Sequence, residues 1–419
     1  MANDFNKEER VAFEELLEGF NDAEVMSRNV RRYNTNQEMM ERAGDTIWRP
    51  MPYIMNSFDG MDQSSNFNDK TQLAVPSTIT NKKSVPWVMD ALELRDALQE
   101  GRLGDGAKQK LASDINVAVL QEASNLGSLV VPVAAAASGF DDVALAEAIM
   151  NEAGVPEYDR CLALSTRDYN GMASNLADRG TMNAKVNAAY ERAFVGQIAS
   201  FDTWKLDYSR RITAAGGGSI TIDTRDTATN FLVPAAVDAN GQNVDNRFQN
   251  ITVSATSNVA VGDAFTIAGV NAVHHITKED TGQLKTFRVV EVVDGTTLKI
   301  TPGIISAQDT PTEAEVQYQN CIVGTKSATS AITWLNTDAA AINPFWQMDA
   351  IELLPGRYSI PENSGVAVMR GTTDSGIELV MTKFYDINTM KTKFRLDTLF
   401  GVVNKAPEMS GILIFGQTS

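Results

Sequence analysis

The feature that most constrains the fold is an abrupt change of composition at residues 216–218, which are three consecutive glycines. Before them, helix-forming stretches alternate with short apolar runs. After them, Val, Ile and Thr alternate with turn residues at short intervals to about Ile305. Alternation with a period of two, broken by frequent turns, is typical of antiparallel strands. We therefore predict a small antiparallel β-barrel or sandwich after the glycines, which we interpret as a flexible joint.

The sequence TFRVVEVVDGTTLKITP predicts a hairpin in this region, because Asp294 and Gly295 tolerate the positive φ of a tight turn between two β-rich runs. After about Pro344 the pattern changes again, and five separate runs predict strands: DAIELL, GVAVMRG, IELVMTKFYD, KTKFRLDTLFG and SGILIF. These strands need partners, so we expect the chain to return to the core that precedes the glycines. The barrel would then be an insertion over 219–343.

The preceding core, over 138–215, is predicted to be mixed α/β. Asp141 or Asp142 can cap a helix that Gly154 and Pro156 end. The runs that follow are typical of a strand at 160–165, helices at 166–178 and 182–193, and a strand at 201–206. Upstream, a stretch without proline over 105–129 predicts the longest helix of the chain, since its apolar residues fall mainly on one side.

Two blocks of opposite charge lie near the start of the chain. Residues 1–24 hold eight acidic and two basic residues, a net charge of −6, and their apolar residues are spaced like one helical face. We interpret 1–24 as an arm that docks on a partner, or alternatively as a surface helix of the same domain. The sign reverses with Arg28, Arg31 and Arg32, which could pair with neighbouring chains or within the chain. Next, 46–87 predicts an extended excursion with a long tip.

Composition argues against several classes of function. With 36 Lys and Arg against 53 Asp and Glu, the net charge of −17 disfavours a general nucleic-acid-binding role. Transmembrane helices need about 18 consecutive apolar residues, which are absent. His274 and His275 are adjacent in a predicted strand and would point to opposite faces, and Cys161 and Cys321 lack a nucleophile signature. We therefore predict no catalytic, metal or cofactor site and no enzyme activity.

Four segments, in this order, carry a resemblance to a known family: NTNQEMMERAGDTIWRP; LASDINVAVLQEASNLGSLVV; VDNRF followed by GDAFTIAGV and FRVVEVVDGTTLKITP; and KFRLDTLFGVVNKAPEMSGILI. Together they make the chain resemble the Hong Kong 97-type major capsid proteins of tailed bacteriophages, in particular the coat proteins of short-tailed Salmonella phages. The resemblance covers nearly the whole chain. It implies an α+β Hong Kong 97-type capsid fold with an inserted antiparallel β-barrel.

The resemblance also implies a division of the chain. It comprises an N-terminal arm (1–45), an extended loop (46–87), a peripheral domain with a long spine helix and the first part of an axial domain (88–218), the inserted barrel (219–343), and the remainder of the core (344–419). In the family, a loop of the insertion contacts a neighbouring capsomer, and the matching stretch is AVDANGQNVDNRF. The expected interface residues are Arg28, Arg31, Arg32, Asp238, Asp245 and Arg247.

The implied function is that of a major capsid protein, which assembles in the bacterial host cytoplasm into the icosahedral procapsid and head of the virion. The implied partners are copies of itself in hexamers and pentamers, a scaffolding protein, a portal protein, and packaged double-stranded DNA enclosed without sequence-specific binding; no membrane is implied. Two alternatives stay open. One is a β-barrel binding or adhesion module on a globular carrier, and the other is an encapsulin-like nanocompartment shell.

Overall fold

A computed structural model describes residues 7–23, 25–33, 46–51, 55, 57, 59–64, 66–67, 69–90, 97–179, 196–206, 209–222, 231–307, 311–323, 330–358, 360 and 365–418. They form a mixed α/β fold that divides into two compact units. The first unit comprises Met1–Ile47, Ser77–Leu120 and Ile351–Val403, and the second comprises Trp48–Pro76, Gln121–Ala350 and Asn404–Ser419. The helix predicted over 182–193 lies outside the described residues.

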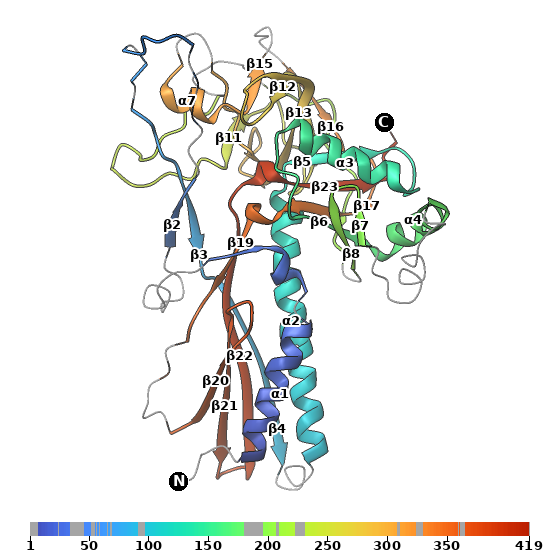
Figure 1. The fold of residues 1–419 in the computed structure, drawn as a ribbon, viewed down its shortest axis with the longest axis vertical. Helices are drawn as coiled ribbons and strands as arrows, with labels where there is room; N and C mark the ends of the chain where they lie inside the picture. The colour runs from blue at the N-terminus through green and yellow to red at the C-terminus, as the bar shows by residue number, and fades with distance from the viewer. Residues whose placement is uncertain are drawn as a thin grey trace. The chain divides into compact units, whose positions relative to one another are not determined.

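The first unit is built on a sheet of order β1-β19-β22-β21-β20, with β4 also paired to β22 (Figure 1). The strands are β1 (Arg31–Arg32), β4 (Asn81–Asp90), β19 (Ile351–Pro355), β20 (Ala367–Thr372), β21 (Glu378–Asp386) and β22 (Lys391–Asn404). Strands β4, β22, β21 and β20 pair antiparallel in succession, whereas β1 pairs parallel with β19. The hairpin β21–β22 therefore projects a turn at residues 387–390.

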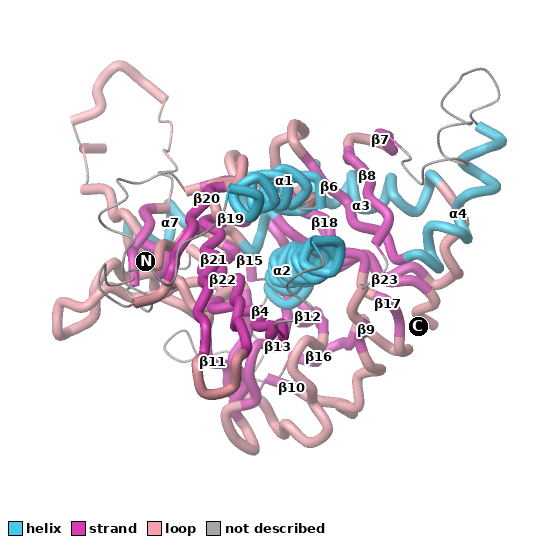
Figure 2. Tube along the Cα trace, turned by 90° about the horizontal axis from the view of Figure 1, so that it is seen from below, coloured by secondary structure: helices cyan, strands magenta, loops and turns pink. Residues whose placement is uncertain are grey.

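Helix α1 (Lys7–Ala23) packs against β20, and Figure 2 shows the helix beside this strand from below. Phe13, Leu16 and Phe20 on the apolar face of the helix are buried. A Cβ atom at Gly371 of β20 would lie only 3.0 Å from the Phe13 and Leu17 side chains, so this strand position accommodates the helix closely. The apolar face is thus covered within the unit, which favours the interpretation of α1 as a surface helix of its own domain.

Helix α2 (Ala97–Leu126) begins eight residues earlier than predicted and ends close to the predicted position. Two glycines, Gly101 and Gly104, lie in the stretch before residue 105, and each costs a helix up to about 1 kcal/mol relative to alanine. Tertiary packing offsets this cost. Leu16 of α1 lies 3.5 Å from the position of a Cβ atom at Gly104, an ordinary van der Waals distance, so α1 packs against this part of α2.

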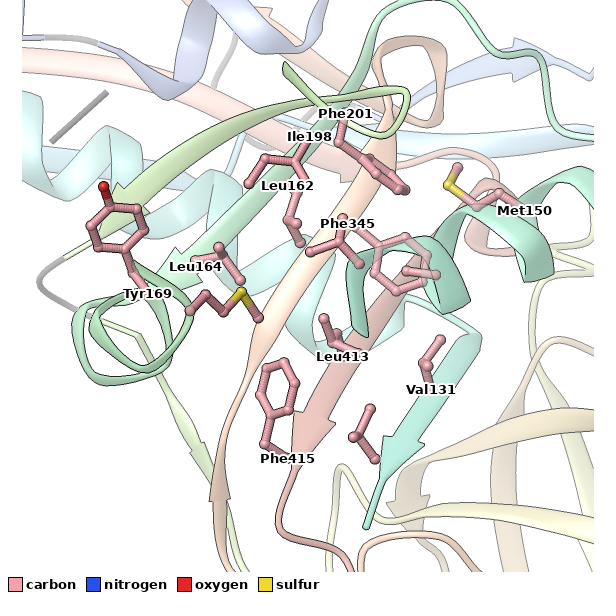
Figure 3. Packing of buried hydrophobic residues seen from close by; sticks show 14 of the residues in the cluster. Val131, Met150, Leu162, Leu164, Tyr169, Ile198, Phe201, Phe345, Leu413 and Phe415 are labelled. Atoms are coloured by element: carbon pink, nitrogen blue, oxygen red, sulfur yellow. The ribbon is translucent and has the colours of Figure 1, made fainter. Parts of the chain in front are cut away.

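The second unit contains a six-stranded sheet of order β5-β23-β18-β6-β8-β7. Its strands are β5 (Leu129–Val133), β6 (Arg160–Ser165), β7 (Gly196–Ile198), β8 (Phe201–Leu206), β18 (Asn343–Gln347) and β23 (Ser410–Phe415). Helices α3 (Phe140–Glu152) and α4 (Thr166–Arg179) pack on it, and Figure 3 shows the core that includes Leu162, Phe345 and Leu413. The strands at 160–165 and 201–206 and the first two predicted helices of this region are confirmed.

A second sheet of the same unit contains seven strands in the order β10-β16-β12-β13-β14-β11, with β15 also paired to β12. They are β10 (Thr221–Ile222), β11 (Gln249–Thr252), β12 (Ala264–Val273), β13 (Asp280–Val292), β14 (Thr297–Thr301), β15 (Cys321–Val323) and β16 (Ser330–Trp334). The strand pairs β10–β16, β16–β12, β12–β13, β13–β14, β14–β11 and β12–β15 are antiparallel, and a bridge between Ile222 and Val253 joins the two ends of the sheet. Helix α7 (Glu313–Tyr318) precedes β15.

The predicted hairpin at Asp294 and Gly295 is confirmed as β13–β14, but its turn forms differently. Neither residue has positive φ; instead the Asp294 carboxylate accepts hydrogen bonds from the backbone N–H and hydroxyl of Thr296. The glycine run also has a packing role. A Cβ atom at Gly217 would lie 2.6 Å from the Trp334 ring, so the absence of side chains leaves room for this tryptophan.

The end of the chain only partly returns to the predicted core. Strands β18 and β23 do pair with β6 and β5 of the mixed sheet. Strands β19 to β22 instead build the sheet of the first unit, because the long β22 pairs with β4 from far upstream. The remaining described elements are short: η1 (Met26–Asn29), η4 (Met348–Ala350), η5 (Pro407–Met409), β2 (Thr46–Pro50) paired with β3 (Ala74–Thr78), and β9 (Arg211–Ile212) paired with β17 (Ala340–Ala341).

Candidate functional site

The three candidate arginines near the start of the chain lie together on the surface of the first unit. Helix η1 is fastened by the Met26 backbone N–H, which donates to Asn116 Oδ1 at 3.0 Å, and β1 follows directly. Arg28, Arg31 and Arg32 are all exposed. Arg32 donates to the Asp374 carbonyl at 2.8 Å, so this guanidinium is engaged within the unit. The structure thus keeps all three arginines exposed at the surface of the first unit.

The predicted contact loop of the second unit forms a tight, exposed turn at Asp238. Its carboxylate accepts the backbone N–H groups of Asn240 and Gln242 at 2.8 and 2.9 Å. Gly241 adopts φ of +75°, a conformation that costs glycine little, and Val237 and Asn243 form a bridge below the turn. The turn is therefore preorganised by its own side chain and presents its tip to solvent.

Asp245 and Arg247, predicted as interface residues, bond to each other within the subunit. The Arg247 side chain is 8% exposed and lies 2.7 Å from Asp245 in a two-pronged ion pair. Its remaining guanidinium nitrogen donates to the Asn404 carbonyl at 2.6 Å, and Phe248 lies beneath the guanidinium. A guanidinium held by these bonds stabilises the base of the loop.

Two clusters of exposed apolar side chains were missed by sequence reasoning. One lies on the segment between β2 and β3, where Met61 and Phe67 are 105% and 87% exposed. The other is the tip of hairpin β21–β22, where Ile387 and Met390 are 78% and 62% exposed. Apolar groups gathered on projecting tips are typical of surfaces that contact another molecule. The available signal was the run YDINTMK, which places both apolar residues in a turn between two predicted strands.

A cavity of about 1050 Å³ lies inside the second unit, beside β13, α3 and residues 405–409. Lys285 of β13 forms an ion pair with Glu408 at 2.5 Å within its lining. Burial would raise the pKa of Glu408, but Lys285 and the neighbouring His275 and Lys278 hold that pKa below its usual value. Burial lowers the pKa of His275 and brings that of Lys278 to about 8. The lining thus contains a carboxylate that is kept charged.

This ion pair leads to a prediction about pH. A carboxyl whose pKa is depressed by folding stabilises the folded protein above its unfolded value, near 4.5, and this contribution is lost as the pH falls through the folded pKa. Lys285→Met should remove the cation that does most to lower the pKa of Glu408, so most of this stabilising contribution should be lost. The urea midpoint of the wild type should fall as the pH decreases below about 4.5, because Glu408 becomes protonated. The midpoint of the variant should show less of this fall. Superimposable profiles for the two proteins would contradict the assignment.

The described residues carry no arrangement typical of catalysis. They include no cluster of three or more His, Cys, Asp or Glu side chains that could hold a metal ion. His274 and His275 lie in a turn after β12 and not in a strand; the His274 ring accepts the backbone N–H groups of Ile276 and Thr277. Cys161 and Cys321 are buried, and burial raises the pKa of each thiol to about 12. No helix in the described ranges is long and apolar enough to span a bilayer.

Comparison with known proteins decides the family. Residues 1–416 match the family model described as P22 coat protein, gene protein 5. The chain belongs to this family. The resemblance predicted from the four sequence segments is confirmed, and the chain is a major capsid protein, the subunit of a phage head shell.

Several solved structures are similar to this coat protein. A chain from Mycobacterium phage Che8 is 9% identical, with 93% of this chain and 90% of that chain covered and a TM-score of 0.43. A chain from the mature capsid of bacteriophage PhiM1 is 10% identical, with coverages of 94% and 87% and a TM-score of 0.43. The CUS-3 coat protein I-domain is 46% identical, with coverages of 28% and 96% and a TM-score of 0.23.

Proposed function

We propose that this coat protein builds an icosahedral procapsid of hexamers and pentamers with the Hong Kong 97-type architecture. Its partners would be further copies of itself, a scaffolding protein, a portal protein and the packaged DNA, with assembly in the host cytoplasm. The observation that carries the proposal is the pair of exposed apolar tips, Met61 with Phe67 and Ile387 with Met390, on a protein of a coat family. A structural subunit needs such surfaces, and they would be a liability in a solitary protein.

The two units can be assigned in these terms. The sheet of β20, β21, β22 and β4 with helix α1 would be the peripheral domain, and the sheet from β5 to β7 would be the axial domain. The seven-stranded sheet, which starts after the three glycines and whose ends are bridged at Ile222 and Val253, would be the inserted domain. Residues 51–73, between β2 and β3, would be the extended loop that reaches a neighbouring subunit.

The geometry of a closed shell requires each subunit to have several contact surfaces. Each subunit must make self-complementary twofold contacts and also head-to-tail contacts that close into rings, so one chain has to present several distinct surfaces. The exposed turn at Asp238 is suited to a twofold contact. Its shape is fixed by the hydrogen bonds to the Asp238 carboxylate, and this charged group lies at the surface of the turn. Many weak contacts then reinforce each other once a ring has formed.

The exposed arginines yield a prediction for assembly. Replacing Arg28 and Arg31 with glutamate reverses two exposed charges, and like charges placed opposite an acidic partner surface oppose association. We expect the yield of particles in the presence of scaffolding protein to fall, and the fall to lessen at high salt, where charge repulsion is screened. Circular dichroism of the monomer serves as the folding control. If the variant formed particles at the wild-type yield, these arginines would have no role in the assembly contacts.

Sedimentation and negative-stain imaging of the full-length protein, with and without its scaffolding partner, test the proposal as a whole. We expect closed particles whose size is narrower in the presence of the partner. A protein that stays small at every concentration would favour the alternative in which the bridged sheet is a binding module. Particles that enclose an enzyme and no DNA would favour a nanocompartment shell.

A further inference from the structure

The base of the extended loop is held by helix α7 of the same subunit. The Leu73 backbone N–H donates to the Tyr318 hydroxyl at 3.2 Å, while its carbonyl accepts the Met51 N–H at 2.8 Å. Leu73 is 1% exposed and packs with Tyr318 and Ile305 in a small apolar cluster, which Met51 and Leu232 complete. One residue of the loop therefore joins both of its strands to the helix.

An ion pair reinforces this attachment three residues earlier in the loop. Lys70 Nζ lies 3.2 Å from Glu313 Oε2, and the two side chains are 23% and 38% exposed. Exposed pairs contribute little to stability, because solvent screens them. Such a pair can still orient the loop, since the opposite charge of Glu313 on α7 favours one placement of Lys70 over others. The pair and the Tyr318 bond together attach the loop at both ends of a helix only six residues long.

The helix is itself firmly mounted on the seven-stranded sheet. At its start, Thr312 and Glu315 form a reciprocal capping box. Beyond its end, the Asn320 side chain accepts the Ile305 N–H at 3.0 Å and donates to the Gly303 carbonyl at 2.7 Å. Helix α7 therefore has a fixed position relative to β14, and the loop inherits it through Leu73.

We propose that α7 is the mount that aims the extended loop at a neighbouring copy of this chain, with Tyr318 as a positioning residue. The inference rests on the proposed function, in which this loop makes a contact between subunits. A free loop would lose conformational entropy when it binds, whereas a loop already fixed at its base loses less. The seven-stranded sheet thus contributes to assembly through the loop as well as through its own surface. Met61 and Phe67 are the exposed side chains that the mount presents.

Hydrogen exchange in the full-length monomer tests the mount before any shell forms. Tyr318→Phe removes the hydroxyl that accepts the Leu73 N–H and keeps the aromatic ring. We expect exchange in the peptide that contains Leu73 to accelerate about fivefold, the factor that corresponds to one ordinary hydrogen bond. Tyr385→Phe is the matched control, since Tyr385 is 38% exposed and lies on β21 of the first unit. Equal exchange rates of the Leu73 peptide in wild type and Tyr318→Phe would contradict the proposal that α7 holds the base of the loop.

A charge exchange tests the consequence for assembly. Lys70→Glu and Glu313→Lys each place like charges together and should slow assembly with scaffolding protein, and the double variant should recover most of the wild-type rate. Singles that assemble as wild type, or a double variant no faster than the singles, would overturn the aiming role. A wild-type protein that never forms particles would defeat the proposed function instead, and the exchange measurement at Leu73 would still decide whether α7 holds the loop.

Discussion

Replacement of Arg288 by methionine should lower the free energy of unfolding by about 3–5 kcal/mol, the range observed when one partner of a buried charge network is removed. Arg288 lies on β13 and is 1% exposed. Its guanidinium donates to the carbonyls of Gly262 and Ser124 at 3.0 Å each and to that of Gly127 at 3.4 Å. The last two carbonyls lie at the end of α2, where backbone groups lack partners within the helix.

The reason for so large an effect is that several groups lose their partner at once. Burial lowers the pKa of Arg288 to about 10, yet the side chain stays charged at neutral pH. Burial also raises the pKa of Asp263, and Arg288 counteracts that rise. Methionine fills similar volume but donates nothing, so three carbonyls and a carboxyl remain in a site with little water.

Urea denaturation of the monomer, followed by circular dichroism, measures this effect. Arg167→Met provides the matched control, because Arg167 is exposed on α4 and its loss should change stability by no more than about 0.5 kcal/mol. If Arg288→Met lowered the free energy of unfolding by less than about 1 kcal/mol, groups other than Arg288 would have to satisfy the carbonyls at the end of α2.

The second large effect concerns assembly and not stability. Ile387→Asp should reduce the particle yield by more than about tenfold, since a loss of only about 1.4 kcal/mol at one contact gives that factor and the contact recurs in every subunit. Ile387 projects from the turn between β21 and β22 and is 78% exposed, so the monomer should fold normally. Burying an aspartate there on association would carry a desolvation cost that the aliphatic side chain avoids.

Sedimentation velocity with scaffolding protein measures the yield, and near-ultraviolet circular dichroism checks the fold. Thr389→Asp is the matched control, because it adds the same charge to the same turn without removing an apolar group. We expect it to assemble better than Ile387→Asp. Normal particles from Ile387→Asp would exclude the hairpin tip as an assembly contact.

Much of the secondary structure could be predicted because its signals are local. The strand predicted at 160–165 is β6 over the same residues, and the hairpin of 286–302 forms where the two β-rich runs flank Asp294. Such elements follow from side-chain periodicity and from the dihedral preferences of turn residues. The start of α2 was predicted too late, because the first eight residues of the helix include Gly101 and Gly104, which have low helix propensity.

The pairing of distant groups could not be predicted in the same way. Folding places the Asn404 carbonyl 2.6 Å from the Arg247 guanidinium, although the two residues are 157 positions apart in sequence. Lys285 and Glu408 are separated by 123 positions, and neither has a local pattern that identifies the other. Solvent-exposed and buried arginines look alike in a sequence, because the difference lies in what surrounds them.

The sequence by itself determined the class of the protein: its coat-family segments, the change to alternating β-residues after Gly216, and the lack of a catalytic signature. Only the tertiary structure decided which charges are satisfied inside the subunit, that β19 to β22 build a sheet separate from β18 and β23, and which apolar tips remain exposed. The physical reason is range. Periodicity and turn preference act over a few residues, whereas burial and ion pairing depend on neighbours that only the folded chain brings together.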